Sequence, residues 1–483
     1  MINNHNNDIL SSSSESKIKK KYKNNKKINQ NLFSNDVDYI YNLPEEIFVK
    51  ILSYLYEGDI FNCSLVSNYW YKVTQSDEVW LNIYKKISFH CQLLKQDYEF
   101  DFKSIMKSND IAKSNWKNGK YKVKVFNNAH SEVPTSIKFT GKYIISSSNS
   151  AVKVWDYFKS EGIFTFKTKN PINVMELDIR NKKVIGGALN GFVNVFNLKT
   201  NEIEASFKGH QSFVSCLKSN HNSTIFCTGS KDKEIRLWTI DNNQYYTDDD
   251  QQENSSLRMI RLLGSHTKII TNVEWCNRNN NHLVSSGDKL IKLWDVETGQ
   301  CITSLEGSSL NINPSCLSVK DGFIASGGEG NTVSIWDKRL DTPIKKIVTS
   351  DTIFYTLQYE PSLDSMVTGS FDFIRCFHVS SATLISTLNH KPALVSSAHY
   401  DPEKVISFGL DGIINVWNCN LDYSQSPNPA INNKCNYKIE CQPLIRTTHV
   451  DETKIITGSY DNTIRIFDFT NDKKDESNKC TIM

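Results

Sequence analysis

Hydrophobic and polar positions divide the chain into a polar start, a helical stretch and a long repetitive region. Residues 1–37 combine Asn clusters, the Ser11–Ser14 run and the Lys-rich stretch Lys17–Lys27. Such a composition cannot offset the entropy lost on ordering by burying apolar surface, so we predict a disordered tail. The Lys run is typical of a solvated tail, and a nuclear address or a contact with an anionic surface is the alternative.

From Leu43 onward the pattern becomes helical. Pro44 suits the first position of a helix, and the two Glu residues after it suit the first turn. Apolar residues then fall on two neighbouring stripes, which are Ile47, Ile51 and Leu55, and Phe48 and Leu52. A segment of about 45 residues buries too little surface to cover both stripes by itself. The following helices or a partner must cover the rest.

From residue 121 onward, short strand-like runs alternate with turn residues, and the string GSKDKEIRLW at 229–238 recurs in altered form. The related strings end at Trp155, Phe196, Trp238, Trp294, Trp336, Phe377, Trp417 and Phe467. Their spacing is 40–42 residues, except for gaps of 56 and 50. A period of about 40 with four strands per unit is typical of a β-propeller. We predict eight blades over residues 121–470, or seven if the weak unit at Phe196 does not form.

Two features of the repeat concern its loops and its closure. The long gaps contain insertions at 241–256 and 420–436, which we place between the third and fourth strands of their units. The last unit ends at Asp468 without a fourth strand, whereas Tyr121–Phe126 is a strand without a unit. Pairing this strand with the last blade removes an exposed edge, so we predict that it closes the ring.

Composition and charge restrict the class of protein. The net charge of +3, from 56 Lys and Arg against 53 Asp and Glu, is too balanced for nucleic-acid binding through a charged field. We find no apolar run long enough for a membrane span and no apolar core of a signal peptide. Twelve Cys without a C-x-x-C pair fit a reducing compartment. We therefore expect a cytoplasmic protein, with the nucleus as the alternative, and no metal or cofactor.

Residues 38–84 resemble the F-box. The match comprises Leu43-Pro44, Ile47, the run Ile51–Leu55, Asp59, Val66-Ser67, Trp70 and Trp80. In that family the surface at the Leu-Pro pair docks a Skp-type adaptor, which links to a cullin and a ubiquitin-conjugating enzyme. The resemblance places four residues at this contact: Leu43, Pro44, Ile47 and Leu52. For each of them, a position in the internal core is the alternative.

The recurring string resembles the WD repeat, and residues 85–120 are expected to form a helical linker whose Asn-Trp-x-x-Gly ending resembles that of F-box/WD-repeat proteins. The resemblance implies a hydrogen-bonded tetrad in each blade. His210, Thr228, Asp232 and Trp238 fit it, as do His390, Ser407, Asp411 and Trp417, and His266, Asp288 and Trp294 fit in part. Their regular positions favour a structural role over a catalytic one. The expected fold is α+β and multidomain, with a small helical F-box, a helical linker and an all-β propeller.

In WD propellers, the residue before the first strand and the residue before the Asp of the second turn point to the top face. When the eight units are aligned by their recurring strings, the first position holds Thr135, Met175, Ser215, Thr271, Ser315, Tyr355, Ser396 and Arg446. It gives Lys231, Phe371, Leu410 and Tyr460 for the second. Receptors of this family that read phosphorylated segments use several Arg, which fork onto phosphate, but only Arg446 and Lys231 are basic here.

We therefore predict that the top face binds a protein substrate through an apolar patch rather than a phosphate clamp. The predicted contacts are Lys231, Tyr355, Phe371, Leu410, Arg446 and Tyr460. The alternative is that they are ordinary exposed turn residues.

Residues 471–483 are expected to form a flexible tail. They end with Cys480-Thr481-Ile482-Met483, which has the pattern of a prenylation signal, with Met favouring farnesyl. One lipid chain anchors only marginally, and the Lys17–Lys27 run could supply the second signal that stable membrane association requires.

The pattern as a whole predicts the substrate-recognition subunit of an SCF-type E3 ubiquitin ligase. No nucleophile elbow, phosphate loop or paired metal motif is found, so we expect a non-catalytic receptor. The first alternative is a membrane-tethered WD scaffold without a ubiquitin role. The second is an enzyme in the central channel, for which only Arg446, Lys231 and Glu329 offer ionisable groups near the top face.

Overall fold

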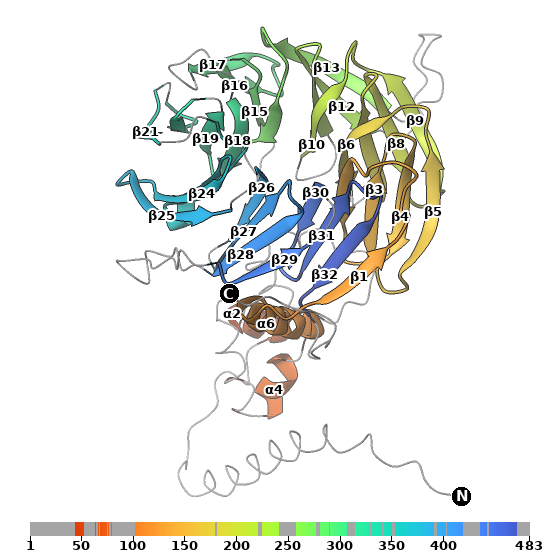
Figure 1. Ribbon diagram of the computed structural model, residues 1–483, viewed down its shortest axis with the longest axis vertical. Helices are drawn as coiled ribbons and strands as arrows, with labels where there is room; N and C mark the ends of the chain where they lie inside the picture. Colours follow the sequence, from red (N-terminus) through yellow and green to blue (C-terminus); the bar gives the residue numbers. More distant parts are fainter. Residues whose placement is uncertain are drawn as a thin grey trace, which may run out of the picture. The chain divides into compact units, whose positions relative to one another are not determined.

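The structure, a computed structural model, describes two units that divide after Ser108 (Figure 1). The described residues are 44–52, 63, 66, 68–74, 76, 79 and 102–470, the last range with gaps at 179–180, 221–224, 241–256, 277–280, 289, 307–313, 329, 341, 350–352, 391–393, 402, 419–434 and 442–443. The predicted tails, the first insertion and most of the second lie outside the described residues. Within them, no helix has the length and apolar character needed to cross a membrane.

The first unit contains α2 (Glu45–Leu52) and α4 (Asn68–Thr74). The carbonyl of Pro44 accepts hydrogen bonds from the N–H groups of Ile47 and Phe48, so the helix begins where the sequence predicts. The Phe48 ring packs on the edge of Trp70 at 4.7 Å between centroids. Phe48 and Leu52 are both buried, whereas Ile47 and Ile51 are each 47% exposed. The two predicted stripes therefore differ, because one forms the core and the other faces outward.

The second unit contains the end of α6 (Phe102–Asn118) and eight four-stranded antiparallel sheets. Blade 1 consists of β2 (Ser136–Phe139), β3 (Tyr143–Ser147), β4 (Ala151–Asp156) and β5 (Glu161–Lys167). Blade 2 consists of β6 (Ile172–Asp178), β7 (Lys183–Ala188), β8 (Phe192–Asn197) and β9 (Glu202–Lys208). Blade 3 consists of β10 (Val214–Ser219), β11 (Ile225–Ser230), β12 (Glu234–Ile240) and β13 (Leu257–Ser265). Blade 4 consists of β14 (Asn272–Trp275), β15 (His282–Ser286), β16 (Leu290–Asp295) and β17 (Cys301–Glu306).

The remaining blades repeat the pattern. Blade 5 consists of β18 (Pro314–Lys320), β19 (Phe323–Gly328), β20 (Thr332–Asp337) and β21 (Lys345–Val348). Blade 6 consists of β22 (Thr356–Glu360), a short 3-10 helix η3 (Pro361–Leu363), β23 (Ser365–Gly369), β24 (Phe373–His378) and β25 (Thr383–Asn389). Blade 7 consists of β26 (Val395–Tyr400), β27 (Lys404–Gly409), β28 (Ile413–Asn418) and β29 (Tyr437–Glu440). Blade 8 consists of β30 (Ile445–Val450), β31 (Lys454–Ser459), β32 (Ile464–Asp468) and β1 (Lys122–Phe126).

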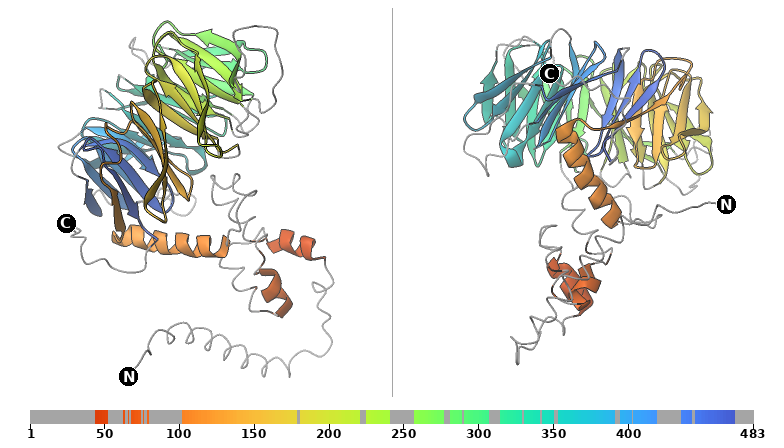
Figure 2. Two further views of the ribbon diagram at one scale, coloured as in Figure 1. Left: turned by 90° about the vertical axis from the view of Figure 1, so that its right-hand side faces the viewer. Right: turned by 60° about the horizontal axis from the view of Figure 1, so that its bottom comes forward.

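The blades follow one another around a ring in chain order, as Figures 1 and 2 show. The prediction of eight blades is confirmed, and the seven-blade alternative is wrong, because the unit at Phe196 forms a complete sheet with Phe196 fully buried. Both predicted insertions fall between the third and fourth strands of their blades, after β12 and after β28.

The ring closes between the two ends of the repeat region. β1 pairs antiparallel with β32, from Lys122 opposite Asp468 to Phe126 opposite Ile464. Phe126 is buried and lies 5.2 Å from the Trp155 ring of blade 1, measured between centroids. The predicted closure is therefore confirmed, and the closing strand also packs against the first blade.

The last turns of α6 are part of the propeller rather than a free linker. The Trp116 ring stacks on Phe469 with 3.5 Å between centroids, and its indole N–H donates to the carbonyl of Glu452 at 2.9 Å. The side-chain amide of Asn115 donates to the carbonyl of Phe469 at 2.7 Å. Because these side chains join the core of blades 7 and 8, the propeller unit starts at Asn109, before the predicted boundary at residue 120.

Candidate protein-binding face of the propeller

The predicted tetrad of blade 3 forms completely. His210 Nδ1 lies 2.8 Å from Asp232 Oδ2, and His210 Nε2 lies 2.7 Å from Thr228 Oγ1. The indole N–H of Trp238 donates to the same hydroxyl at 2.8 Å. Burial by itself would raise the pKa of Asp232, but hydrogen bonds from His210 and from backbone N–H groups outweigh it and lower the pKa to about 2. Every polar atom of this constellation is used inside the blade.

One group of this tetrad also has the residue types of a metal site. His210, Asp232 and Glu234 each offer a ligand atom, and these atoms lie within 4.8 Å of one another. However, His210 and Asp232 bond each other, and Glu234 pairs with Arg236 at 2.5 Å. Their closeness is explained by the tetrad and its neighbouring ion pair.

Two further blades contain tetrad members that the sequence did not reveal. In blade 4, Ser285 joins His266 at 2.8 Å and accepts a hydrogen bond from Trp294 at 2.8 Å. It escaped prediction because its turn is one residue shorter than the turn of blade 3. In blade 1, Ser146 joins His130 at 2.7 Å and accepts from Trp155 at 2.9 Å.

The predicted tetrad of blade 7 is only partly formed. His390 presents Nδ1, rather than Nε2, to Ser407 at 2.5 Å, and the Asn415 amide lies 2.8 Å from the same nitrogen. His390 Nε2 is 3.7 Å from Asp411, which is too long for a hydrogen bond. Trp417 has no hydrogen-bond partner for its N–H in the described structure. The prediction is corrected here because Asn415 competes for the imidazole.

In the first three blades, the residue at the first top-face position connects its blade to the next one through a side-chain hydrogen bond. The hydroxyl of Thr135 donates to the carbonyl of Ile172 in the next blade at 2.7 Å, and Ser215 does the same to Ile270 at 2.5 Å. In blade 2, a β-bulge between Ile172 and Val174 gives this position to Asn173, which donates to Val214 at 3.0 Å. The prediction of Met175 is therefore wrong, and Met175 is buried in the core. The hairpin of β6 and β7 is two residues longer than that of blade 7, because Val174 pairs with Gly187 whereas Ser397 pairs with Phe408, and this length shifts the position from Met175 to Asn173.

Blades 6 and 8 depart from this pattern. The aligned positions hold Tyr355 and Arg446, whose long side chains are exposed. The N–H of Tyr355 donates to Gly369 at 2.9 Å, as the N–H of Thr135 does to Ser147, so the backbone position is the same and only the side chain differs. These two blades present large contact groups where the first three use a connector.

The second top-face position is apolar in the same part of the ring. Leu410 and Tyr460 are 39% and 47% exposed, and their N–H groups bond to the carbonyls of Leu394 and Leu444. Phe371, at the aligned position of blade 6, is 60% exposed. The sequence analysis missed Leu444 and Ile353, which are also exposed and lie just before the inner strands of blades 8 and 6. An alignment of the loops between blades, rather than of the strings alone, would have found both.

We call the exposed set on blades 6 to 8 the apolar face. Its members are Ile353, Tyr355, Phe371, Leu410, Leu444 and Tyr460, together with Arg446. Lys231 does not join it, because it lies on blade 3 with its ammonium 5.6 Å from the centre of the Phe213 ring. Leu189 holds the aligned position of blade 2 and is also exposed, but it is separated from this face around the ring. Five of the six predicted substrate contacts are thus brought to three consecutive blades.

The inner strands carry polar residues at one common level, where each pairs with the same position of its second strand. In order from blade 1 these residues are Lys138, Glu176, Lys218, Glu274, Ser318, Gln358, His399 and His449. Lys138 pairs with Glu176 and Lys218 with Glu274, both at 2.9 Å. Burial would raise the pKa of Glu176, but the charges of Lys138 and Lys218 outweigh it and lower that pKa.

These four charges bind each other across neighbouring blades. Each of the four is therefore paired with a charge of the opposite sign on the next blade. Glu329, which the sequence suggested for the enzyme alternative, lies outside the described residues.

The helical unit presents a separate apolar surface. Ile47 and Ile51 lie one turn apart on α2, and Pro44 and Val66 are also exposed. Leu52 is only 1% exposed, so the prediction of an adaptor contact is corrected for this residue, which packs inside the unit. Leu43 lies outside the described residues. The exposed stripe of α2 is Ile47 and Ile51, and only the first was predicted at a contact.

Family models match segments near the start of the chain and in the repeat region. The model of the F-box-like family matches residues 40–86. The model of the WD domain, G-beta repeat, matches residues 121–156, 201–239, 257–295, 299–337 and 434–468. Blades 2, 6 and 7 fall largely outside these matches but have the same four-stranded structure as the others.

Individual relatives are similar to about half of this chain. Mitochondrial division protein 1 of Eremothecium gossypii is 27% identical over 285 residues, which cover 54% of this chain and 39% of that protein. The protein of the same name from Schizosaccharomyces pombe is 24% identical, with 48% of this chain and 33% of the relative covered. A ribosome biogenesis protein WDR12 homolog of Nematostella vectensis is 26% identical, with 46% of this chain and 58% of the relative covered. The chain thus spans less than two thirds of the length of each of these relatives.

A solved structure shows the same fold. The crystal structure of the computationally designed Ika8 protein matches with a TM-score of 0.59 and 19% sequence identity, covering 71% of this chain and 98% of the designed one. At this identity the match concerns the fold alone.

Proposed function

Since the chain combines an F-box-like domain with WD40 repeats, as F-box/WD-repeat proteins do, we propose that it is the substrate-recognition subunit of an SCF-type ubiquitin ligase. In this proposal the F-box-like domain binds a Skp-type adaptor and, through it, a cullin. The propeller binds the protein to be modified. The chain itself is non-catalytic, and its contribution is to hold the substrate near the enzyme that transfers ubiquitin.

The observation that carries the proposal is the presence of two separate apolar surfaces on the two units. The α2 stripe of Ile47 and Ile51 stays exposed although Phe48 and Leu52 fill the core beneath it. The apolar face lies on blades 6 to 8, where long side chains replace the connecting residues seen in the first three blades. Exposed apolar groups gathered in this way are typical of protein-binding surfaces.

The α2 stripe gives the first test. We expect Ile47→Asp with Ile51→Asp to reduce co-purification of adaptor and cullin at least about tenfold, because two charges would have to be buried at the contact. Thermal unfolding should stay unchanged, since both side chains are already about half exposed. Ile203→Asp, a similarly exposed isoleucine on β9, serves as the control and should retain the adaptor. Recovery of adaptor by the double variant at the parent's level would contradict the proposal.

The apolar face gives the second test. Tyr355→Ala with Tyr460→Ala should lower the recovery of substrate proteins at least about tenfold while adaptor and cullin stay bound. Substrates are recognised in the parent as proteins whose ubiquitination is lost in the α2 double variant. The matched control is Phe158→Ala with Leu384→Ala, which removes exposed apolar groups outside the face. If the tyrosine and control variants lose substrates equally, the face is not the binding site.

The face also favours one class of substrate segment. It offers six apolar side chains and the single guanidinium of Arg446. A phosphate clamp needs several such cations. We therefore propose that the substrate binds through apolar anchors with one acidic group, without a requirement for phosphorylation.

The membrane alternative rests on Cys480, which lies outside the described residues. From the tetrapeptide pattern we propose a farnesylated, cytoplasmic protein that associates with membranes, and the mass of the peptide containing Cys480 tests this. A membrane-tethered scaffold without a ubiquitin role would keep its activity in the α2 double variant, whereas the ligase subunit would lose it.

A further inference from the structure

The junction between blades 7 and 8 differs from the junction between blades 3 and 4. In blade 3, Cys216 is buried and packs in one core cluster with Val273 of blade 4. Ser397 holds the place of Cys216 in blade 7, directly after the β-bulge of the inner strand, and is partly exposed. Its hydroxyl lies 3.2 Å from the hydroxyl of Thr448 in blade 8. Short polar side chains therefore leave the inner strands partly exposed at this junction.

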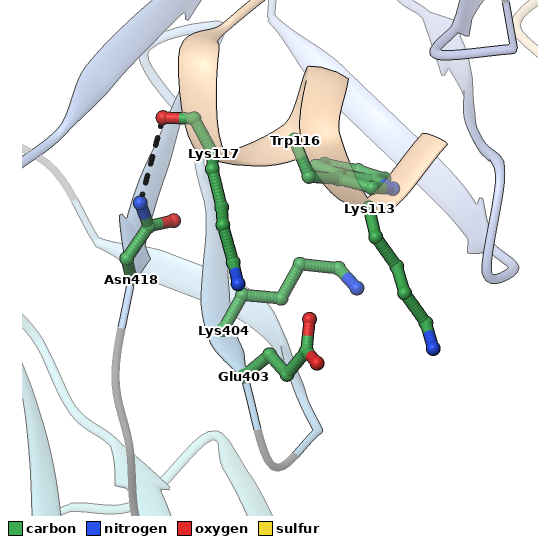
Figure 3. Close-up of a pocket in the computed structure, with 6 residues that line it drawn as sticks. All are labelled: Lys113, Trp116, Lys117, Glu403, Lys404 and Asn418. Carbon is green, nitrogen blue, oxygen red and sulfur yellow. Dashed lines mark hydrogen bonds between the residues drawn. The ribbon is translucent and has the colours of Figure 1, made fainter. Parts of the chain in front are cut away.

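Helix α6 covers one end of the junction. Figure 3 shows Trp116 and Lys117 of the helix beside Lys404 of blade 7. The side-chain amide of Asn418, at the end of β28, donates to the carbonyl of Lys117 at 3.5 Å, and the Trp116 ring stacks on the aromatic ring that follows β32 of blade 8. Lys404 starts β27, whereas Ser396 lies at the open end of the same hairpin. The helix therefore leaves uncovered the end of the junction that meets the apolar face.

Ser396 is the short residue at the first top-face position of the apolar face. Blade 6 has Tyr355 and blade 8 has Arg446 at this position, and both side chains are exposed. Ser396 and Arg446 occupy the same backbone position, because each is the extra residue of a β-bulge. The hydroxyl of Ser396 donates to the carbonyl of Phe408 in its own blade at 3.0 Å. A serine therefore stands between the long side chains of the neighbouring blades, and Leu410 lies beside the start of its strand.

We propose that Ser396 determines the size of the residue that anchors the substrate to the apolar face, an inference that rests on the proposed function of that face. A large apolar residue of the substrate, of the size of Leu or Phe, lies over Ser396 and contacts Tyr355 and Leu410. Its side chain leaves water on binding, so a small residue at this place binds less tightly.

Arg446 determines what stands next to the anchor. Its side chain is exposed, and its guanidinium makes no hydrogen bond or ion pair with any residue in the described part of the chain. A carboxylate accepts two parallel hydrogen bonds from such a group. The segment that fits this part of the face therefore has a large apolar residue close to an acidic one.

Random twelve-residue peptides, displayed on phage and selected on the full chain, provide the probe. We expect the enriched peptides to contain Leu, Ile, Met or Phe close to Asp or Glu. Replacing that apolar residue by Ala should weaken binding to the parent at least about tenfold, measured by fluorescence polarisation with synthetic peptides. Replacing the acidic residue by its amide should weaken binding several-fold.

Ser396→Leu tests the role of size. We expect this variant to bind the selected peptides at least about tenfold more weakly although it adds apolar surface, because the new side chain occupies the place of the anchor. It should bind the peptides with the Ala anchor at least as tightly as those with the large anchor, which also shows that it is folded. Ser396→Ala keeps the side chain short and should bind like the parent. Thr271→Leu enlarges the same position on blade 4 and serves as the control.

Three results would overturn the role of Ser396: the parent enriches no peptide with an apolar and an acidic residue close together, Ser396→Leu keeps the parent's affinity for the selected peptides, or Thr271→Leu loses as much affinity as Ser396→Leu. The variant Tyr355→Ala with Tyr460→Ala separates this inference from the proposed function. If the selected peptides bind that variant as they bind the parent, they do not use the apolar face, and both proposals are wrong. If that variant loses the peptides while Ser396→Leu keeps them, the face stands and the role of Ser396 is wrong.

Discussion

Replacing Trp238 by Ala is expected to lower the free energy of unfolding by about 3–5 kcal/mol, the range for a large buried aromatic residue. The side chain is fully buried, stacks on Phe226 with 6.2 Å between centroids and donates its N–H to Thr228. Its removal leaves a cavity and takes away one hydrogen bond of the blade 3 tetrad. Differential scanning calorimetry of the full chain should show a strong fall in the unfolding temperature of the propeller.

A pair of conservative variants separates the hydrogen bond from the packing. Trp336 of blade 5 is also fully buried, but its N–H has no hydrogen-bond partner in the described structure. Trp238→Phe loses volume and a hydrogen bond, whereas Trp336→Phe loses volume alone. We expect the first variant to cost about 1 kcal/mol more than the second. Equal costs for the two variants would mean that the tetrad contributes nothing beyond packing.

Acidification from pH 7 to pH 4 is expected to destabilise the propeller through its buried histidines. Burial, and then the charge of Lys153, lower the pKa of His130 to about 4. Since an imidazole in the unfolded chain has a pKa near 6.5, the unfolded state takes up a proton in this window that the folded state does not. The loss amounts to about 3 kcal/mol between pH 6.5 and pH 4. Burial also lowers the pKa values of His266 and His390, which adds to the effect.

The pH range in which stability is lost identifies the groups that cause the loss. Asp232, with a pKa of about 2, loses its stabilising effect only as the pH falls from about 4 towards 2, below the histidine window. His130→Gln removes one titrating group and should reduce the fall in unfolding temperature between pH 7 and pH 5. An unchanged pH slope in this variant would show that His130 is not responsible. The stability of the His130→Gln variant at pH 7 serves as the reference for its own pH dependence, since the substitution also changes the hydrogen bond to Ser146.

Regular spacing explains why most of the propeller could be predicted from the sequence. Eight strings of similar spacing fix eight blades, and the leftover strand at Tyr121–Phe126 has only one place to pair. Local irregularities explain the failures. The hairpin of β6 and β7 is two residues longer than that of blade 7, which moved the top-face position from Met175 to Asn173, and the shortened turn after Ser285 hid a tetrad member. One or two residues gained or lost in a turn change which residue occupies the aligned position, and no periodic pattern reveals the change.

Burial on the binding surfaces was harder to predict than fold. Leu52 and Ile51 are neighbours of similar character, yet the first is in the core and the second is exposed, because Phe48 sets which stripe faces α4. The sequence likewise gave no sign that Lys404 and the helix residue Trp116 meet, since they lie far apart along the chain. Such contacts depend on how the elements pack, which only the structure shows.

The closing strand also determines when the propeller can be completed during translation. β1 leaves the ribosome first among the strands, but its partner β32 follows about 350 residues later. At about 5–20 residues per second, that delay lasts roughly 20–70 s. During that time the open edge of β1 has no partner, and Phe126 cannot take its place between blades 8 and 1. The nascent chain therefore has to carry an unpaired strand through most of its translation, and the ring closes only after β32 has been made.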